Sequence, residues 1–377
     1  MELLQQARAE IDAVDAEMAA LFERRMQAVA RVAQSKAASG KPVFDPERER
    51  AVIAKNTARI QNPELRPYYQ RFITQAMAVS RAYQRKILGR NVAAYQGVQG
   101  AWAQIALQRI FPFAKQVACQ TWADVFDLVS AGQAEFGVLP FENSNAGDVS
   151  TVLDLLYAHP ELSVAGMYDL PIRQDLLGVP GATLEGLRTV ISHQQALSQS
   201  GPFLRAHHLE TKVWGNTADA ARHVAELADP KVGAIASAET ARLYGLSILA
   251  EGINEDGDNT TRFIVIHQGG AGEQPVHAGQ RIALLFTVDH KPGKLAQVIE
   301  RIGGMGFNME SIKSRPLPHV QFEYYFFVQL ICPAGAEGRT CRELLANLQE
   351  PCRTVRLLGV FDRETRDAPD PEKEAVL

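Results

Sequence analysis

The first 88 residues carry a helical pattern of apolar positions. Apolar side chains recur there at spacings of three, four and seven residues. This spacing predicts one face of a long first helix, which consists of Leu4, Ile11, Val14, Met18, Phe22, Val29 and Val32.

Two breaks divide this segment into three helices. SGKP (39–42) ends the first helix, and Asp45 followed by Pro46 is a typical start for a second. QNPE (61–64) precedes a third. Three helices of one chain bury the long apolar face poorly, so we expect an intertwined helical dimer.

Between residues 91 and 267 the pattern changes to short apolar runs that alternate with helical stretches. The runs are 91–97, 134–143, 187–193, 231–237 and 262–267, and the helical stretches include 121–131, 148–158, 196–207 and 217–228. This alternation predicts an α/β fold with mainly parallel strands. Polar residues follow many strands, so we favour two lobes around a ligand crevice over one large domain.

A glycine-rich linker, 268–280, separates a smaller C-terminal domain. Residues 281–361 read strand, helix, strand, strand, helix, strand, which is the βαββαβ order of a ferredoxin-like fold. The charged tail after Phe361 is expected to be disordered.

Composition excludes several classes of function. The chain has 377 residues, of which 46% are hydrophobic and 22% charged, and its net charge is −4. This charge argues against nucleic-acid and membrane partners. The four cysteines lack CxxC spacing, so we expect no metal site and a reduced, cytoplasmic protein. Neither a signal peptide nor a membrane span is indicated.

Two cations stand within the apolar face of the first helix. Arg25 and Lys36 share that face with Phe22 and Val29, and the eleven steps along the chain from Arg25 to Lys36 amount to about three full turns. A cation on a buried face needs a partner. Internal salt bridges or snorkelling at the rim of the bundle are the structural alternatives to a ligand.

Further polar groups line the other two predicted helices. They are Asp45, Arg48 and Glu49 on the second helix, and Ser80 and Gln84 on the third. A site rich in Arg and Lys suits a small anion with several carboxylates. Arg8 lies 17 residues before Arg25, or about 25 Å along a straight helix, so it would serve the site of a partner chain.

This set of residues resembles the all-helical chorismate mutases in residue type, order and spacing. The resemblance implies rearrangement of chorismate to prephenate without a covalent step. Arg25 and the partner's Arg8 would bind carboxylates, and Lys36 and Gln84 would stabilise charge on the breaking ether oxygen. Glu49 and Asp45 would hold the ring hydroxyl, with Arg48 and Ser80 completing the shell.

The α/β segment resembles prephenate dehydratase over its full length, with a two-lobed fold like that of periplasmic binding proteins. The matching stretches are GVQGAWAQ (97–104), LPFENSNAG (139–147), ISHQQALSQ (191–199), GNTADAA (215–221), AIASAETARLYGL (234–246) and NTTRFIVI (259–266). Taken alone, the polar lead-in of the last stretch could be a turn. The resemblance instead makes Thr261, Arg262 and Phe263 its functional signature.

In that reaction prephenate loses its ring carboxylate and hydroxyl together to give phenylpyruvate. Thr261 would donate to the leaving hydroxyl, and Arg262 would add positive potential. The other candidates for substrate binding are Gly100, Ala101, Glu142, Asn143, Ser144, His193 and Phe263. Structural alternatives are a capping or core role for His193 and an N-cap for Glu142.

The C-terminal domain resembles the phenylalanine-binding ACT regulatory domains through residues 290–316. The transferable effector positions are Gly293, Leu295, Asn308, Ser314, Arg315 and Pro316. Lys294 and Lys313 depart from the usual Gly-Ala-Leu and Glu-Ser-Arg-Pro patterns. A ferredoxin-like dimerisation module without a ligand is the alternative.

The order of the three parts resembles the bifunctional chorismate mutase/prephenate dehydratases (P-proteins) of phenylalanine biosynthesis. We place their boundaries at 1–88, 91–267 and 281–361. The resemblance implies chorismate and prephenate as ligands, L-phenylalanine as effector, a homodimer or tetramer, and no cofactor or metal. The alternatives are a dehydratase with a vestigial mutase domain and a non-catalytic two-lobed amino-acid sensor; the intact cations and Thr-Arg-Phe triplet argue against each in turn.

Overall fold

The computed structural model describes residues 2–39, 41, 43–255, 257–270, 276–318, 320–335 and 341–365. They form two compact units. The first comprises Met1–Val92 with Phe113–Lys115, and the second Ala93–Pro112 with Gln116–Leu377. Within the described ranges, no helix combines the length and apolar character needed to cross a membrane.

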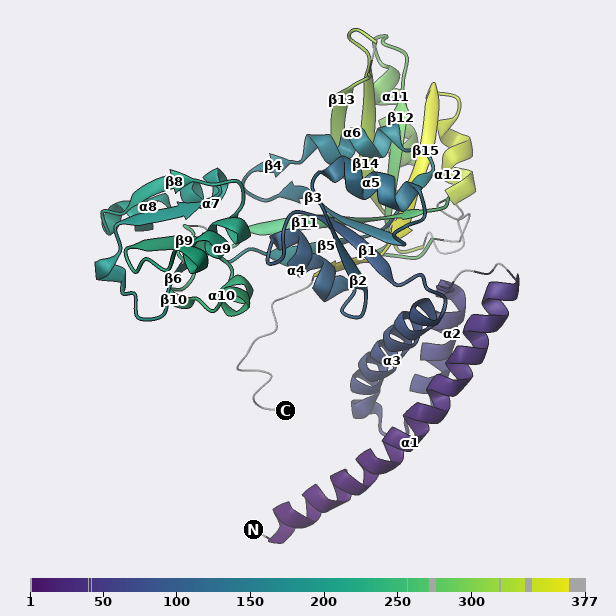
Figure 1. Ribbon diagram of the computed structural model, residues 1–377. Coiled ribbons are helices and arrows are strands. Elements are labelled where there is room, and N and C mark those ends of the chain that lie inside the picture. Colours follow the sequence, from purple (N-terminus) through teal and green to yellow (C-terminus); the bar gives the residue numbers. More distant parts are fainter. Residues whose placement is uncertain are drawn as a thin grey trace. The chain divides into compact units, whose positions relative to one another are not determined.

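The first unit is helical, as predicted. Its elements are α1 (Glu2–Ser39), α2 (Pro46–Thr57), the short 3-10 helix η1 (Pro63–Leu65) and α3 (Arg66–Ile87). Asp45 caps α2, since its carboxylate accepts from the Arg48 amide at 3.0 Å. Gly40 and Pro42, in the predicted first break, lie outside the described residues. Figure 1 shows α1 extending well past α3.

The second unit contains one lobe built on a seven-stranded sheet. Its strands are β1 (Val92–Gln96), β2 (Lys115–Cys119), β3 (Phe136–Asn143), β4 (Gly147–Asp148), β5 (Leu162–Pro171), β11 (Thr260–Gln268) and β16 (Arg363–Thr365), in the order β16-β5-β11-β3-β1-β2 with β4 beside β3. The helices of this lobe are α4 (Trp102–Ile110), α5 (Trp122–Ser130) and α6 (Ser150–Ala158).

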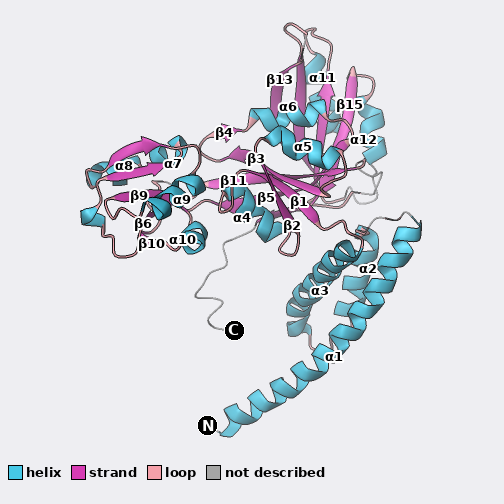
Figure 2. Ribbon diagram, viewed as in Figure 1, coloured by secondary structure: helices cyan, strands magenta, loops and turns pink. Residues whose placement is uncertain are grey.

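A second lobe carries a five-stranded sheet, seen in magenta in Figure 2. Its strands are β6 (Asp175–Gly178), β7 (Thr189–Ser192), β8 (Glu210–Val213), β9 (Val232–Ala236) and β10 (Ser247–Ala250), in the order β10-β6-β9-β7-β8. Its helices are η2 (Leu184–Gly186), α7 (Gln194–Gln199), α8 (Gly201–Ala206), α9 (Thr217–Leu227) and α10 (Ala238–Tyr244).

Two predictions about these lobes were wrong. The sheets are mixed, because β11 runs antiparallel to both of its neighbours and β6 runs antiparallel to β9 and β10. The expected helix 196–207 is two helices, α7 and α8. Pro202 lies at the start of α8, and its lack of an amide hydrogen suits a first turn but not a helix interior.

Two chain segments connect the lobes, one between β5 and β6 and the other between β10 and β11. Hydrogen bonds join them side by side: the Ile253 amide donates to the Gln174 carbonyl at 2.8 Å, and the Ile172 amide donates to the Asn259 carbonyl at 2.7 Å. The Gly252 amide donates to the Asp175 carboxylate at 2.8 Å. The paired connections hold the start of β11 at the meeting point of the lobes.

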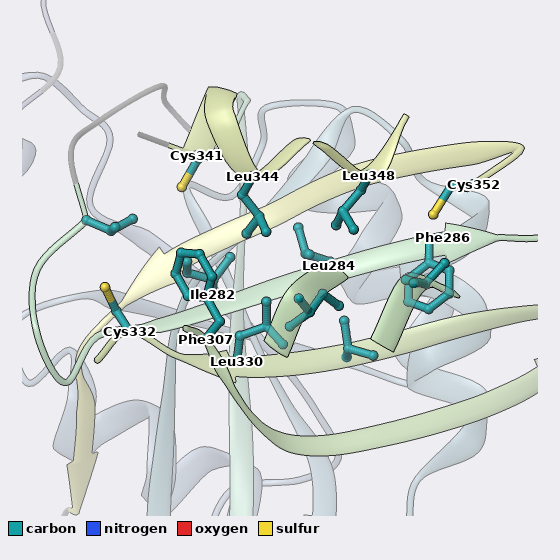
Figure 3. Close-up of a cluster of buried hydrophobic side chains, with 14 residues drawn as sticks. Ile282, Leu284, Phe286, Phe307, Leu330, Cys332, Cys341, Leu344, Leu348 and Cys352 are labelled. Atoms are coloured by element: carbon teal, nitrogen blue, oxygen red, sulfur yellow. The ribbon is translucent and has the colours of Figure 1, made fainter. Parts of the chain in front are cut away.

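The C-terminal domain has the expected βαββαβ order. Its elements are β12 (Arg281–Thr287), α11 (Lys294–Gly304), β13 (Asn308–Pro316), β14 (Tyr324–Ile331), α12 (Cys341–Leu348) and β15 (Thr354–Phe361), with an antiparallel sheet in the order β13-β14-β12-β15. Figure 3 shows side chains such as Ile282, Leu284 and Leu344 filling the core between sheet and helices.

The expectation of a disordered tail was wrong at its start. Arg363–Thr365 form β16, which pairs in parallel with β5 at the edge of the large sheet. Residues 366–377 lie outside the described residues. Composition alone gave no signal for a three-residue strand whose partner is about 200 residues away in sequence.

Candidate functional site

The register of β11 separates the Thr-Arg-Phe triplet onto two faces of the sheet. Thr261 lies opposite Asn143 of β3, whereas Arg262 lies opposite Glu142 of β3 and Asp169 of β5. Successive side chains of a strand point to opposite faces. Thr261 with Asn143 therefore forms one polar group, and Arg262 with its two acids forms another.

The amide of Asn143 is the centre of the first group. Its Nδ2 donates to Thr261 Oγ1 at 3.0 Å and to Asn259 Oδ1 at 2.8 Å. Its Oδ1 accepts from the Ala146 amide at 2.9 Å and from Gln195 Nε2 at 3.3 Å. Asn143 is 8% exposed. A buried amide with its donors and acceptors paired is held in one orientation.

This network includes residues from both lobes. Gln195 belongs to α7 of the second lobe, and so does Gln199, whose Oε1 accepts from Asn259 Nδ2 at 3.1 Å. Asn259 is 1% exposed. The Thr260 amide in turn donates to Ser144 Oγ at 3.0 Å. These side chains fix Thr261 where the lobes meet.

Thr261 has a hydroxyl that can still donate. Its oxygen accepts from Asn143, and within the described residues its hydroxyl hydrogen has no acceptor. The side chain is half-buried. A threonine hydroxyl oriented by a buried amide in this way is a suitable hydrogen-bond donor for a ligand.

Arg262 is enclosed by carboxylates. Its Nε donates to Asp169 Oδ1 at 2.8 Å, and its Nη1 donates to Glu142 Oε2 at 3.3 Å. Burial alone would lower the pKa of Arg262, but the hydrogen bond to Asp169 and the charges of Asp169 and Glu142 raise it above its usual value. The guanidinium is therefore charged and paired with two acids; its role in adding positive potential stays a prediction.

The Gly100 loop contacts the second lobe closely. Gly100 has φ +87°, and a Cβ there would lie 3.2 Å from Thr240 Oγ1 and from a Leu243 methyl group. Thr240 Oγ1 also donates to the Gly100 carbonyl at 2.9 Å. Ala101 follows in extended conformation and begins α4. This close approach requires glycine.

The remaining dehydratase candidates have structural contacts. His193 caps α7, where its Nδ1 accepts from the Gln195 amide at 3.3 Å. This contact is the capping role given above as the structural alternative for His193. Phe263 lies in β11, and its side chain is 1% exposed in the hydrophobic core. Glu142 is a strand residue paired with Arg262, not an N-cap.

In the helical unit, the two unusual cations of α1 are half-buried and bond to neutral acceptors. Arg25 donates to Ser80 Oγ and to the Ala76 carbonyl, the latter at 3.3 Å. Lys36 Nζ donates to the Val43 carbonyl at 2.6 Å. Among the described residues, neither cation has a carboxylate within ion-pair distance. Their charges are thus not neutralised by internal acids.

Gln84 has a buried polar atom that its described surroundings leave without a hydrogen bond. It is 7% exposed, and its Oε1 has no hydrogen-bond partner among the described residues. Leaving a buried amide oxygen unpaired costs about 1–3 kcal/mol. Such a group on the inner side of a bundle is what a polar ligand would satisfy.

The other mutase candidates lie at the edge of the bundle or in contacts that we did not predict. Glu49 forms an ion pair with Arg81, whose guanidinium lies 5.2 Å from the centre of the Phe44 ring. Asp45, Arg48 and Arg8 are exposed. In the single chain Arg8 is remote from Arg25, as expected if it serves a partner's site.

The predicted effector residues lie around the start of α11 and along β13. Gly293 begins α11 with φ +80°, and Leu295 packs against the core. Asn308, Ser314 and Pro316 are exposed. Arg315 instead contacts the first lobe, where its Nη2 lies 2.6 Å from Asp154 Oδ2.

Sequence reasoning missed several residues that complete these groups. Asn259, Gln195 and Gln199 stand inside the stretches NTTRFIVI and ISHQQALSQ, which were therefore the available signal. Asp169 had no such signal in the sequence, because strand β5 was not predicted. Arg81 also had no such signal, since one more cation on a polar helix is common.

No cluster of three or more His, Cys, Asp or Glu side chains suited to a metal ion occurs in the described part of the chain. The four cysteines are free and buried.

Comparisons with known proteins identify both units. A family model described as Prephenate dehydratase matches residues 93–271, and one described as Chorismate mutase type II matches residues 7–85. Solved structures similar to this chain include a prephenate dehydratase from Arthrobacter aurescens in complex with L-Phe, with a TM-score of 0.65 and 25% identity over 72% of this chain and 90% of that chain. Another is GqqA, described as a novel type of quorum quenching acylase, with a TM-score of 0.65 and 29% identity over 74% of this chain and 98% of that chain.

Full-length relatives match across both units. The chain is 34% identical to a bifunctional chorismate mutase/prephenate dehydratase of Neisseria gonorrhoeae, over 96% of this chain and 97% of the relative. It is 30% identical to the corresponding protein of Aquifex aeolicus, over 96% and 99%. The chain therefore belongs to the family of bifunctional chorismate mutase/prephenate dehydratases.

Proposed function

We propose that the Asn143–Thr261 group is the catalytic centre for the dehydratase activity of this enzyme, which converts prephenate to phenylpyruvate. The observation that carries the proposal is the 3.0 Å hydrogen bond from Asn143 to Thr261, inside a buried amide network drawn from both lobes. We assign the dehydratase to residues 91–267 and the mutase to residues 1–88.

The dehydratase reaction requires mainly that the protein align prephenate with a hydrogen-bond donor. The bond from the ring to its carboxylate breaks and releases CO₂, its electrons enter the ring, and the ring hydroxyl leaves as hydroxide, which takes up one proton from solvent to become water. Aromatisation drives the step. Thr261 donates to the departing oxygen while Asn143 holds its hydroxyl oxygen, and a positioned donor of this kind contributes about 100-fold or more.

The test replaces Thr261 by valine, which keeps the branched shape and removes the hydroxyl. We expect prephenate turnover to fall about 100-fold or more, with prephenate binding retained. Thr260→Val is the matched control, because the neighbouring Thr260 hydroxyl donates only to the Asp258 carbonyl at 3.2 Å. An unchanged rate in Thr261→Val would remove this residue from the mechanism.

For the rearrangement of chorismate to prephenate, we propose a centre around Arg25, Lys36 and Gln84. Two unneutralised cations and one unsatisfied amide suit a dicarboxylate whose ether oxygen gains negative charge in the transition state. Because a terminal amide presents its oxygen or its nitrogen after a flip, Gln84 can donate to that oxygen. Glu49, which forms an ion pair with Arg81, would hold the ring hydroxyl.

The mutase centre would be completed by a second copy of the chain. The apolar face of α1 is open in the single chain, with Leu4 56%, Ile11 58% and Val14 51% exposed. Burying such a face against an identical helix is strongly favourable. An antiparallel arrangement would bring the partner's Arg8 towards Arg25.

We further propose that residues 281–361 form an ACT regulatory domain that binds L-phenylalanine and inhibits prephenate turnover. Gly293 begins α11 with a positive φ and open space around it, and the first turn of a helix can bind an amino-acid carboxylate through its amides. Asn308 and Ser314 of β13 are exposed. Gly293→Val should weaken inhibition by L-phenylalanine without changing the uninhibited rate. Unaltered inhibition would favour a dimerisation module without a ligand.

A further inference from the structure

A lysine of the C-terminal domain reaches the Arg262 side of the large sheet. Lys313 of β13 lies with its Nζ 3.2 Å from Glu142 Oε1, and it also forms an ion pair with Asp148 of β4. The same Nζ lies 5.4 Å from the centre of the Phe141 ring. The Lys313 side chain is 10% exposed. A lysine this well covered and paired is atypical of a surface charge.

Glu142 joins this lysine to the triplet. One of its carboxylate oxygens meets Lys313, and the other accepts from Arg262 Nη1 at 3.3 Å. Arg262 Nε donates in turn to Asp169 Oδ1 at 2.8 Å. The result is a row of charges of alternating sign that runs from β5 across β11 and β3 to the C-terminal domain, and each member has an opposite charge beside it.

The row is covalently adjacent to the proposed catalytic pair. Arg262 follows Thr261 in β11, and Glu142 precedes Asn143 in β3. A shift of β3 or β11 at these positions would therefore also move Asn143 and Thr261 relative to each other.

Alternation along β13 gives Lys313 a fixed direction. Lys313 and Arg315 point to the first lobe, whereas Ser314 between them is exposed on the other side. Arg315 and Tyr325 both bond Asp154 of α6, and Tyr325 stacks on Tyr157 with ring centres 4.4 Å apart. These contacts seat β13 on the lobe and hold Lys313 at Glu142.

We propose that Lys313 is a positioning residue of the dehydratase centre, acting through Glu142 and Arg262 on the Asn143–Thr261 pair. The proposal rests on the proposed function of that pair. It also gives the departure from the Glu-Ser-Arg-Pro pattern a consequence: a glutamate at position 313 would place a third carboxylate beside Glu142 and Asp148 and push β3 away from β13.

The test measures kcat and KM for prephenate, with chorismate turnover by the other unit of the same chain as the internal reference. Lys313→Met should lower the prephenate kcat by about 3- to 30-fold, below the roughly 100-fold that a 1 Å misplacement can cost, with little change in KM. Lys313→Glu should lower it further, Lys313→Arg should restore most of it, and chorismate turnover should stay at the wild-type rate.

A matched lysine and a double-mutant cycle isolate the contact. Lys291→Met, at a 71% exposed lysine of the same domain, should leave both activities unchanged. Glu142→Gln combined with Lys313→Met should lose less than the product of the two single losses, because both changes cut the same row. If Lys313→Met fails to fold, Lys313→Gln, which keeps a donor without the charge, carries the same expectations.

Two results overturn the inference: a wild-type prephenate kcat in both Lys313→Met and Lys313→Gln, or fully additive losses in the cycle. Its failure is distinct from failure of the proposed function. If Thr261→Val loses turnover while Lys313→Met keeps it, only the role of Lys313 falls. If Thr261→Val keeps turnover, the catalytic assignment itself falls.

Discussion

At the scale of single residues, neighbouring side chains of β11 have different surroundings because successive residues of a strand point to opposite faces of the sheet. Thr261 faces a buried amide network, and Arg262 faces carboxylates. The hydroxyl that we propose as the donor and the guanidinium paired with acids are therefore one residue apart in the chain but lie on opposite faces of the sheet.

Lys36→Ala is the most informative single change in the helical unit. It removes a donor proposed to meet the ether oxygen, and loss of one such donor typically costs about 100- to 1,000-fold in kcat. Chorismate turnover should fall by this amount and prephenate turnover should not change. Parallel assays of the purified variant with each substrate check the prediction.

A control for that variant is Lys55→Ala, a lysine in the last turn of α2 that takes no part in the proposed centre. Wild-type chorismate turnover in Lys36→Ala would exclude Lys36 from the mutase centre.

Most members of the proposed centres could be named from the sequence, but their contacts could not. Thr261, Asn143, Arg25 and Gln84 were recognisable from motif and spacing. Their partners depend on strand register, which is set by pairings between residues more than a hundred positions apart. For this reason the two acids around Arg262 could not be foreseen.

At the scale of elements, the contact between α6 and β13 depends on one aspartate. Hydrogen bonds from Arg315, and then from Tyr325, lower the pKa of Asp154 below its usual value despite its partial burial. A group whose pKa is lowered on folding stabilises the folded state above its unfolded pKa of about 3.9, and this contribution is lost as the pH falls through the folded pKa.

Wild-type protein should therefore be more stable than Asp154→Asn at pH 7, and the difference should shrink as the pH falls below about 4. Thermal unfolding of both proteins across this range measures it. Asp127→Asn, at an exposed position of α5, is the control. A difference that grows in acid would contradict the assigned sign.

The apolar pattern predicted the type of many elements, but it missed strands such as β5 and did not predict how the strands pair. The helices of the first unit and the βαββαβ order were predictable because each has a strong local period. The mixed sheets, the split between α7 and α8 and the added strand β16 depend on tertiary pairing and on one proline.

At the scale of the whole molecule, the proposed mutase centre predicts complementation between inactive chains. Arg8→Ala and Arg25→Ala should each lose chorismate turnover, since each removes one carboxylate contact from every site. A mixed dimer would contain one intact site and one doubly altered site, so random reassociation of equal amounts should restore about one quarter of wild-type turnover.

The control for this experiment mixes each variant with itself after the same dissociation and reassociation. Turnover that stays at the level of the separate variants would mean that Arg8 and Arg25 serve the same chain's site or that Arg8 serves none.

We assign two separate centres to one chain and place Thr261 in the second. Chorismate supplied alone to the Thr261→Val variant, with both products followed over time, checks this assignment. Prephenate should accumulate at the wild-type mutase rate with phenylpyruvate nearly absent. Phenylpyruvate formed at the wild-type rate, without accumulation of prephenate, would rule the assignment out.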